Sequence, residues 1–492
     1  MINSSSQKIF NNSILYAIGT VASKAAAFIL IPIYTYNLTS EEYGIATTIT
    51  TFVSTFGIVM MLSLRAAIIR FFNEYQAGQR QIFIGTITIT VIVNSILLSA
   101  LLIVFHDLYT DIFFKDISFY PYVLLGIISL GTEGIYLTYQ SVLQAEQSGG
   151  RYSLNSFIYF LLNASLTIVF VVIMDLSVLG VVLANLFTNG LFAIYGLVEM
   201  VAKRYLIFKF DVRIFKKCIK YSLPILPHNL ANDMNVYANK IIINNYLNYA
   251  LTGIYSLASQ FASMVNLIQG SINLAFRPWF IEQMKNGEEG RHQIKYMTEM
   301  IMALFCFIAV SVSVFSREIV VLFASNEYYS AWSIIPLFVF VHLITFIYYS
   351  HVQTLMYNVK ISKFTSICSI SGFFTNVIIS LILVKSFGVY GIAIAQLCSK
   401  IVLSLIAVIM SNRAEKVDFG LKKMILYLFF AAAIIGVSIF FTHIIGRGLS
   451  VFVSLLLRFL LLAITFMVYI GGYIGDYKQL ILGLVKKGNH NG

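Results

Sequence analysis

The chain has 492 residues, of which 59% are hydrophobic and only 11% are charged, a balance that excludes an ordinary soluble domain and is typical of a membrane protein. Its four cysteines stand far apart with no CxxC pair, which argues against a disulfide framework and against a zinc site. The formal net charge of +12 could point to nucleic acid, so the placement of the cations along the chain decides its meaning.

Hydrophobic stretches of about 20 residues or more, each long enough to cross a bilayer, follow one another with short breaks. We predict fourteen transmembrane helices, at 12–35, 43–69, 81–105, 119–143, 152–174, 177–202, 218–246, 250–276, 296–324, 329–357, 363–384, 388–410, 421–445 and 449–473. The sequence therefore predicts an all-α integral membrane protein.

Most loop cations fall on one side of the membrane when the N-terminus is placed in the cytoplasm. Twenty-four lysines and arginines then lie inside, and only Lys115, Arg317, Lys385 and Arg447 lie outside. Positively charged loops mark the cytoplasmic side, so we predict that both termini are cytoplasmic. Topology and contact with anionic lipids then explain the positive charge, and we expect no nucleic acid partner.

A basic segment at 203–217 separates two halves of similar pattern. A shift of 209 residues superposes Leu38 on Leu247, Gly44 on Gly253, Phe52 on Phe261, Ser54 on Ser263 and Ala66 on Ala275. With an even number of helices in each half, the repeats run parallel. We therefore predict an N-terminal six-helix bundle at 1–202, a cytoplasmic basic linker at 203–217, a second six-helix bundle at 218–412, and an extra helix pair with a cytoplasmic tail at 413–492.

The predicted helix at 218–246 is unusually polar for a membrane span. Its amides, Asp233 and Lys240 fall within about half of the circumference, while mostly apolar residues such as Ala231 occupy the other half, although Val236 strays into the polar arc. One half can then face lipid while the other lines a water-filled cavity with its charges turned inward. A structural pair between Asp233 and Lys240 is the alternative. Because the two lie about 10 Å apart along the axis, we expect Asp233 to pair instead with Lys24 or a coupling cation.

Basic residues outnumber acids inside the predicted spans. The cations there are Lys24, Arg65, Lys240, Lys400 and Arg458, and the acids at comparable depth are Glu133 and Asp233. The excess predicts a cavity that favours an anion, because both arginine and lysine bind phosphate oxygens. Arg70 and Arg277 end their helices at the cytoplasmic mouth, where anchoring at the membrane interface is the competing explanation. The candidate substrate-binding residues are Lys24, Arg65, Arg70, Asp233, Lys240, Arg277 and Lys400.

The sequence carries no catalytic constellation. It holds no GxSxG, no HExxH and no nucleotide-binding loop, so we expect neither an enzyme nor the direct use of ATP. His228, His342 and His351 lack metal-ligand spacing, and no metal or other cofactor is expected, although coupling to a proton or sodium gradient stays open. An integral-membrane enzyme would need acidic or His/Asp motifs in cytoplasmic loops, which are short and mostly basic here.

Five stretches of sequence stand out together. They are IPIYTYNLTSEEYGI and LRAAIIRFF in the first half, with PILPHNLANDMNVYANKIII, GIYSLASQF and INLAFRPWF in the second. These stretches resemble polysaccharide flippases of the multidrug/oligosaccharidyl-lipid/polysaccharide exporter superfamily, and the resemblance extends through the twelfth predicted helix. It implies two six-helix bundles that form a V around a central cavity and work by alternating access.

The resemblance also implies a substrate. That substrate is an undecaprenyl-diphosphate-linked oligosaccharide, flipped to the outer leaflet of the bacterial inner membrane for O-antigen, capsule or a related surface polysaccharide. Lys24, Arg65, Arg70 and Arg277 match cavity positions of the family. The implied partners are membrane lipids and a polysaccharide polymerase, and the implied state is a monomer. Two alternatives stay open: a lipid II flippase, which the extra helix pair resembles, and a cation-coupled multidrug exporter, against which Lys24 and the positive excess argue.

Overall fold

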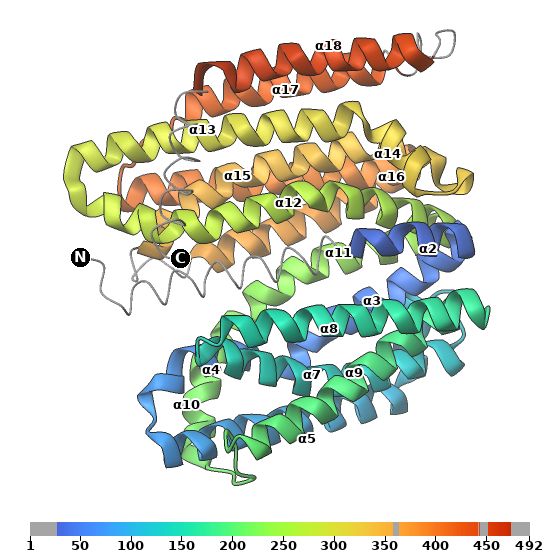
Figure 1. Ribbon diagram of the computed structural model, residues 1–492, viewed down its shortest axis with the longest axis vertical. Coiled ribbons are helices and arrows are strands. Elements are labelled where there is room, and N and C mark those ends of the chain that lie inside the picture. The colour runs from blue at the N-terminus through green and yellow to red at the C-terminus, as the bar shows by residue number, and fades with distance from the viewer. Residues whose placement is uncertain (1–26, 358–363, 441, 443–450, 474–492) are drawn as a thin grey trace. The chain divides into compact units, whose positions relative to one another are not determined.

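The computed structural model describes residues 27–357, 364–440, 442 and 451–473. This part of the chain folds into 17 α-helices joined by short 3-10 and π turns (Figure 1). The helices are α2 (Leu30–Asn37), α3 (Ser40–Met61), α4 (Leu64–Phe71), α5 (Ala77–Val104), α6 (His106–Phe113), α7 (Leu124–Ala145), α8 (Gly149–Thr167), α9 (Ser177–Ala202), α10 (Val212–Ser222), α11 (Leu226–Tyr246), α12 (Tyr249–Gln283), α13 (Gly287–Val314), α14 (Ser316–Phe323), α15 (Ile335–Tyr357), α16 (Phe364–Ala414), α17 (Leu421–Phe440) and α18 (Val451–Tyr469).

Nine helical segments within the described residues are long and apolar enough to cross a membrane, and the all-α membrane class is confirmed. The count of fourteen spans stays a prediction. Most of the first predicted span lies outside the described residues, and α16 joins two predicted spans into one element of 51 residues. This long helix bends at Gly388, whose φ of 54° and ψ of −134° favour glycine.

The predicted span at 43–69 is interrupted, and the sequence gives no glycine or proline to announce it. α3 ends at residue 61, and Leu62 and Ser63 take φ values of 48° and 54° before α4 begins. Asn94 of α5 covers the break, because its Nδ2 donates hydrogen bonds to the carbonyls of Val59 at 3.2 Å and Met60 at 2.6 Å. A side chain from a distant helix thus satisfies backbone groups that the break leaves open.

Two further predicted boundaries are corrected. The predicted span at 296–324 divides at Phe315 into α13 and α14. The predicted linker at 203–217 already contains the start of α10, which Asp211 caps by accepting hydrogen bonds from the backbone N–H groups of Arg213 at 2.7 Å and Ile214 at 3.1 Å.

The chain forms two compact units. Unit 1 comprises Met1–Leu257, Phe323–Tyr328 and Ser369–Ala395, and unit 2 comprises Ala258–Leu322, Tyr329–Cys368 and Gln396–Gly492. The division into six-helix bundles at 1–202 and 218–412 stays a prediction.

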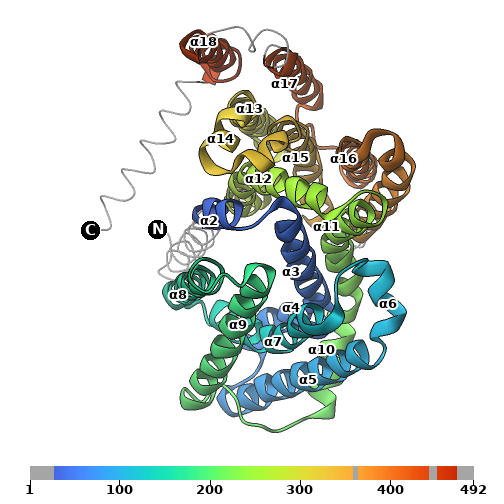
Figure 2. The same ribbon diagram turned by 90° about the vertical axis from the view of Figure 1, so that its right-hand side faces the viewer.

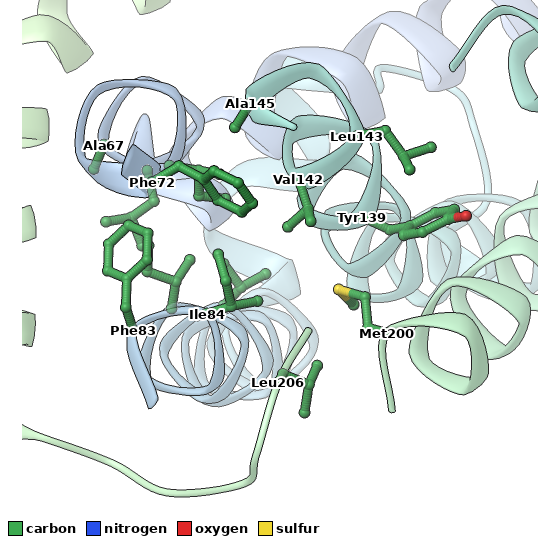
Figure 3. Close-up of a cluster of buried hydrophobic side chains, with 14 of the residues drawn as sticks. Ala67, Phe72, Phe83, Ile84, Tyr139, Val142, Leu143, Ala145, Met200 and Leu206 are labelled. Atoms are coloured by element: carbon green, nitrogen blue, oxygen red, sulfur yellow. The ribbon is translucent and has the colours of Figure 1, made fainter. Parts of the chain in front are cut away.

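Within unit 1, α7 lies between α3, α4, α5, α8 and α9 and contacts each of them (Figure 2). A cluster of fully buried side chains holds these helices together, including Phe83 and Ile84 from α5, Tyr139 and Val142 from α7, and Met200 from α9 (Figure 3). Within a membrane such packing acts mainly through close contact and not through removal of apolar surface from water.

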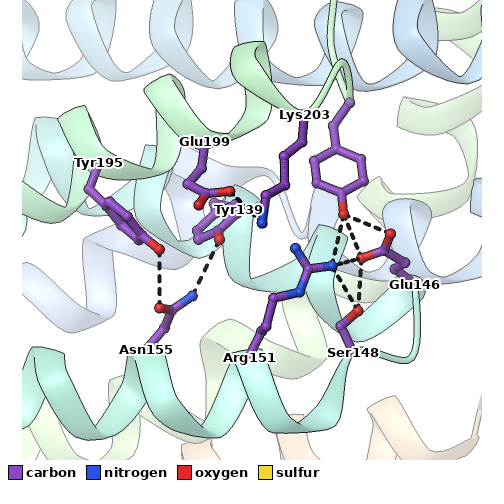
Figure 4. Close-up of polar contacts among 9 residues, drawn as sticks. Tyr139, Glu146, Ser148, Arg151, Asn155, Tyr195, Glu199 and Lys203 are labelled. Carbon is purple, nitrogen blue, oxygen red and sulfur yellow. Dashed lines mark hydrogen bonds and ion pairs between the residues drawn. The ribbon is translucent and has the colours of Figure 1, made fainter.

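A polar cluster ties together one end of α7, α8 and α9 (Figure 4). Arg151 of α8 forms an ion pair with Glu146, which follows α7, and donates a hydrogen bond of 2.9 Å to the Tyr205 hydroxyl. That hydroxyl in turn donates a hydrogen bond of 2.7 Å to Glu146. Directly after α9, Lys203 Nζ lies 3.1 Å from a carboxylate oxygen of Glu199 (Figure 4). These contacts fix the three helices that form most of the cavity described below.

In unit 2, α17 and α18 pack against α13 (Figure 1). Three ion pairs attach α13 to the start of α17 and to the segment before it: Arg291 with Glu415 at 2.8 Å, Lys295 with Asp418 at 2.7 Å, and Glu299 with Lys423 at 3.0 Å. On α18, the buried Arg458 pairs with Glu318 of α14 at 2.8 Å. Ion pairs therefore hold both helices of the extra pair, α17 against α13 and α18 against α14.

Candidate functional site

A cavity with a volume of about 100 Å³ lies in unit 1 between α3, α7, α8 and α9. Apolar groups form most of the wall surface, although seven of the eleven lining residues also carry a polar group. The polar lining residues are Thr50, Ser54, Ser129, Glu133, Tyr159, Asn185 and Asn189. In a chain with 11% charged residues, this concentration of polar groups marks a candidate binding site.

Hydrogen bonds hold the amide side of the cavity in place. The Tyr159 hydroxyl donates to Asn189 Oδ1 at 2.6 Å, and Asn189 Nδ2 donates to Ser129 Oγ at 2.9 Å. Asn163 Nδ2, one turn beyond Tyr159, donates to Asn185 Oδ1 at 3.1 Å. Each amide oxygen keeps a second lone pair, so this wall can still accept a hydrogen bond or ligate a cation.

Glu133 is the acidic group of the cavity. Its Oε2 is buried and forms no hydrogen bond, and within the described segments Glu133 takes part in no ion pair. Gly57 of α3 faces this carboxylate, since a Cβ placed there would lie 3.5 Å from Oε2. The positive charge of Arg65 acts on Glu133 through space. A carboxylate that faces this cavity with no ion-pair partner among the described residues is suited to taking up a proton or a small cation.

The sequence placed Glu133 among the deep acids but not among the site residues. The missed signal lies in the amides at spacing of four, Asn185 and Asn189, within the otherwise apolar α9. Residues at that spacing share one helix face, and a buried amide beside a half-buried one there calls for polar partners.

Lys240 and its neighbours on α11 lie in contacts between helices of unit 1. Lys240 is only 6% exposed, and its Nζ donates to Thr47 O at 2.9 Å and Thr51 Oγ1 at 2.8 Å, both on α3. Asn239 bonds to Tyr255 at 3.2 Å and Asn376 at 2.7 Å. Whether this face lines a water-filled path in another state stays a prediction.

Asp233 does not pair with Lys240 in this structure. Asp233 is exposed, and it forms no ion pair with any other described residue. Two neighbours correct the predicted faces of this helix: Ala231, expected toward lipid, is 7% exposed, and Val236, in the polar arc, is 42% exposed. The proposed partner Lys24 lies outside the described residues.

The remaining candidate residues occupy different surroundings. In unit 1, Arg65 is half-buried on α4, while Arg70 is exposed and pairs with Glu74 at 2.7 Å. In unit 2, Arg277 is exposed on α12. Lys400 is half-buried on α16, and its positive charge interacts electrostatically with His342 of α15.

The chain matches one described protein family and one curated relative. The sequence profile described as "Polysaccharide biosynthesis protein" matches residues 37–333, which is more than half of the chain. Protein 1 of the Lsg locus of Haemophilus influenzae is 24% identical over 284 residues, which cover 56% of this chain and 67% of that protein.

Solved structures share the fold at low sequence identity. The lipid II flippase MurJ, in an inward closed conformation, gives a TM-score of 0.72 at 14% identity over 94% of this chain and 100% of that one. A multidrug resistance MATE transporter of the MOP superfamily, in its inward-facing conformation, gives 0.62 at 14% identity over 82% and 94%. A mutant of the Vibrio cholerae MATE transporter VcmN gives 0.59 at 15% identity over 84% and 98%. The fold is therefore the one that these flippase and transporter structures share.

Proposed function

Because the chain belongs to the polysaccharide biosynthesis protein family, we propose that it is a flippase for lipid-linked oligosaccharides. It moves undecaprenyl-diphosphate-linked repeat units across the bacterial inner membrane by alternating access, with both of its termini in the cytoplasm. The observation that carries this proposal is the family match over residues 37–333, together with a fold that follows a lipid flippase over 94% of the chain. The product is an O-antigen, a capsule or a related surface polysaccharide.

The charge balance within the spans supports an anionic lipid-linked substrate. A diphosphate is costly to move through a low-dielectric path, and fixed cations along that path lower the cost. Lys24, Arg65, Lys240 and Lys400 are the cations that we assign to this task, with Arg70 and Arg277 at the cytoplasmic mouth. Binding must stay weak enough to allow release on the far side.

The cavity around Glu133 supports coupling to an ion gradient. The sequence holds no nucleotide-binding loop, so the energy for repeated cycles must come from another source. A carboxylate that is unpaired within the described residues, beside the oxygen-rich wall of Ser129, Asn185 and Asn189, can bind and release a proton or a sodium ion. The same observation favours the second candidate function, a cation-coupled multidrug exporter, because that function also needs an acidic site.

Complementation separates these functions. The protein is expressed in a strain that lacks its own polysaccharide flippase, and surface polysaccharide is measured with membrane levels checked by blot. Lys24→Ala should lose export and Lys24→Arg should keep part of it, because holding the diphosphate requires a positive charge at this position more than a particular side-chain shape. Drug resistance without restored polysaccharide would favour the exporter, and rescue of a lipid II flippase defect would favour that branch. Full export by Lys24→Ala, Arg65→Ala and Arg277→Ala at normal levels would end the diphosphate-capture proposal.

A further inference from the structure

In unit 1, α3 and the first turns of α12 touch at two glycines. A Cβ placed on Gly44 would lie 1.9 Å from the carbonyl oxygen of Tyr249, and one placed on Gly253 would lie 2.0 Å from that of Ser40. Real Cβ atoms do not approach a backbone oxygen so closely, so the crossing exists only because both positions are glycine. Small residues allow this close approach of helices inside membranes.

The contact is made by equivalent residues of the two repeats. Gly44 and Gly253 are 209 positions apart, and so are Thr47 and Ser256, whose hydroxyl oxygens lie 3.0 Å apart at the same crossing. This is the shift that superposes the two halves of the sequence. By the predicted division into two repeats, the crossing joins one repeat to the other, and we take it as a place where a path between them closes.

A buried charge lies directly beneath this crossing. Lys240 donates to Thr47 O and Thr51 Oγ1, so Thr47 is held from one side by α11 and from the other by Ser256 of α12. No carboxylate in the part of the chain that the structure describes pairs with Lys240. An unneutralised buried ammonium disfavours the closed contact, because separation of the helices lets water or an anion reach it.

A second segment covers the start of α3. Glu327 accepts hydrogen bonds from the backbone N–H of Ser40 at 2.8 Å and from its hydroxyl at 2.6 Å. The Tyr328 hydroxyl donates to the carbonyls of Leu38 at 3.0 Å and Thr39 at 2.9 Å. These bonds satisfy polar groups at the end of α3 that carries Gly44, and they add to the closure.

We propose that the α3–α12 crossing is a seal that separates once in each transport cycle, and that Lys240 keeps the closed contact from becoming too stable to open. The inference rests on the proposed function. By the predicted topology α3 and α12 both begin at the outer face, so the seal closes the outer side of the path. The alternative hypothesis is that the crossing is a fixed pivot, at which the two helices rotate but stay in contact.

Crosslinking tests whether the crossing parts. Thr47→Cys with Ser256→Cys is placed in a chain whose four native cysteines are replaced by alanine, after export by that background has been confirmed. Oxidation should form a disulfide and abolish surface polysaccharide export, and a reductant should restore it. The reduced protein and each single-cysteine variant are the controls. Export by the crosslinked protein would overturn the seal and establish a pivot, while failure of export by every form, wild type included, would count against the proposed function instead.

Glycine variants placed in the double-cysteine chain test the packing of the same crossing. Gly44→Ala and Gly253→Ala should have matching effects, because each adds a Cβ against the carbonyl of the other helix. In the crosslinking background both should form the disulfide about tenfold more slowly, as expected for an overpacked contact. Gly270→Ala, on α12 with nothing within 4 Å of the added Cβ, is the matched control. In the same double-cysteine chain, Lys240→Met should crosslink faster and export more slowly than the chain that keeps Lys240. Unchanged crosslinking rates in Gly44→Ala, Gly253→Ala and Lys240→Met would refute the proposal that glycine packing stabilises the closed crossing and that Lys240 destabilises it.

Discussion

Glu133→Gln should separate stability from transport. The substitution keeps the size of the side chain and removes its charge, at a position where Oε2 is buried without a hydrogen bond. A charged side chain at the centre of a bilayer costs about 2.5–3.5 kcal/mol on insertion scales. Arg65 and the polar cavity offset part of this cost, so we expect Gln to leave the free energy of unfolding unchanged or to raise it by about 1–2 kcal/mol. Export should nevertheless fall to background, since an amide cannot take up a proton.

The assay pairs thermal unfolding in detergent with surface polysaccharide in the complemented strain. Glu199→Gln is the matched control: it is the same substitution on a carboxylate of α9 that lies 3.1 Å from Lys203 and outside the cavity. That control should keep export and lose about 0–1 kcal/mol, as expected for a partly exposed ion pair. A Glu133→Gln protein that exports normally would remove the carboxylate from coupling. Loss of export together with stability would show that Glu133 has a structural role.

Three further predictions concern the edges of the fold. Gly420→Ala should destabilise the protein by about 1–2 kcal/mol, because its φ is 73° and an added Cβ would lie 2.4 Å from a carboxylate oxygen of Glu299; the midpoint of thermal unfolding measures this. Arg458→Met should lower that midpoint too, since it breaks a buried ion pair with a carboxylate of α14, and a double-mutant cycle with that carboxylate should show coupling of about 1 kcal/mol or more. The hydrogen bond from Lys217, which is the largest effect, and nearby positive charges lower the pKa of Glu74 below its usual 4.5. The stabilising contribution of Glu74 is therefore complete above pH 4.5 and is lost as the pH falls through the lowered pKa. When unfolding is followed across this pH range, the Glu74→Gln protein should lack that loss of stability.

Hydropathy predicted most helices of this chain because one physical rule, that a lipid-exposed backbone must bond within its own segment, leaves a long apolar signature. Hydropathy does not reveal a break within a helix when the break is stabilised by a side chain that is distant in sequence. The break at Leu62 and Ser63 depends on Asn94, which lies about thirty residues away in sequence and contacts the end of α3 only in the folded protein. The cavity around Glu133 was missed because its wall is assembled from four helices, and the amides Asn185 and Asn189 of α9 alone do not show which groups they face.

The polar face of α11 shows why sequence alone could not assign its role. Buried polar groups inside a membrane need partners, and a face that contacts water has the same composition as one that contacts another polar helix. The distinction lay in the partner: α3 carries Thr47, Thr48 and Thr51, which supply acceptors for Lys240 and Asn244. If the α3–α12 crossing opens during transport, these bonds exchange for bonds to water or to the substrate. A face that must serve both states needs groups that bond equally well to threonine and to a wet path, and uncharged amides with one mobile ammonium meet that need.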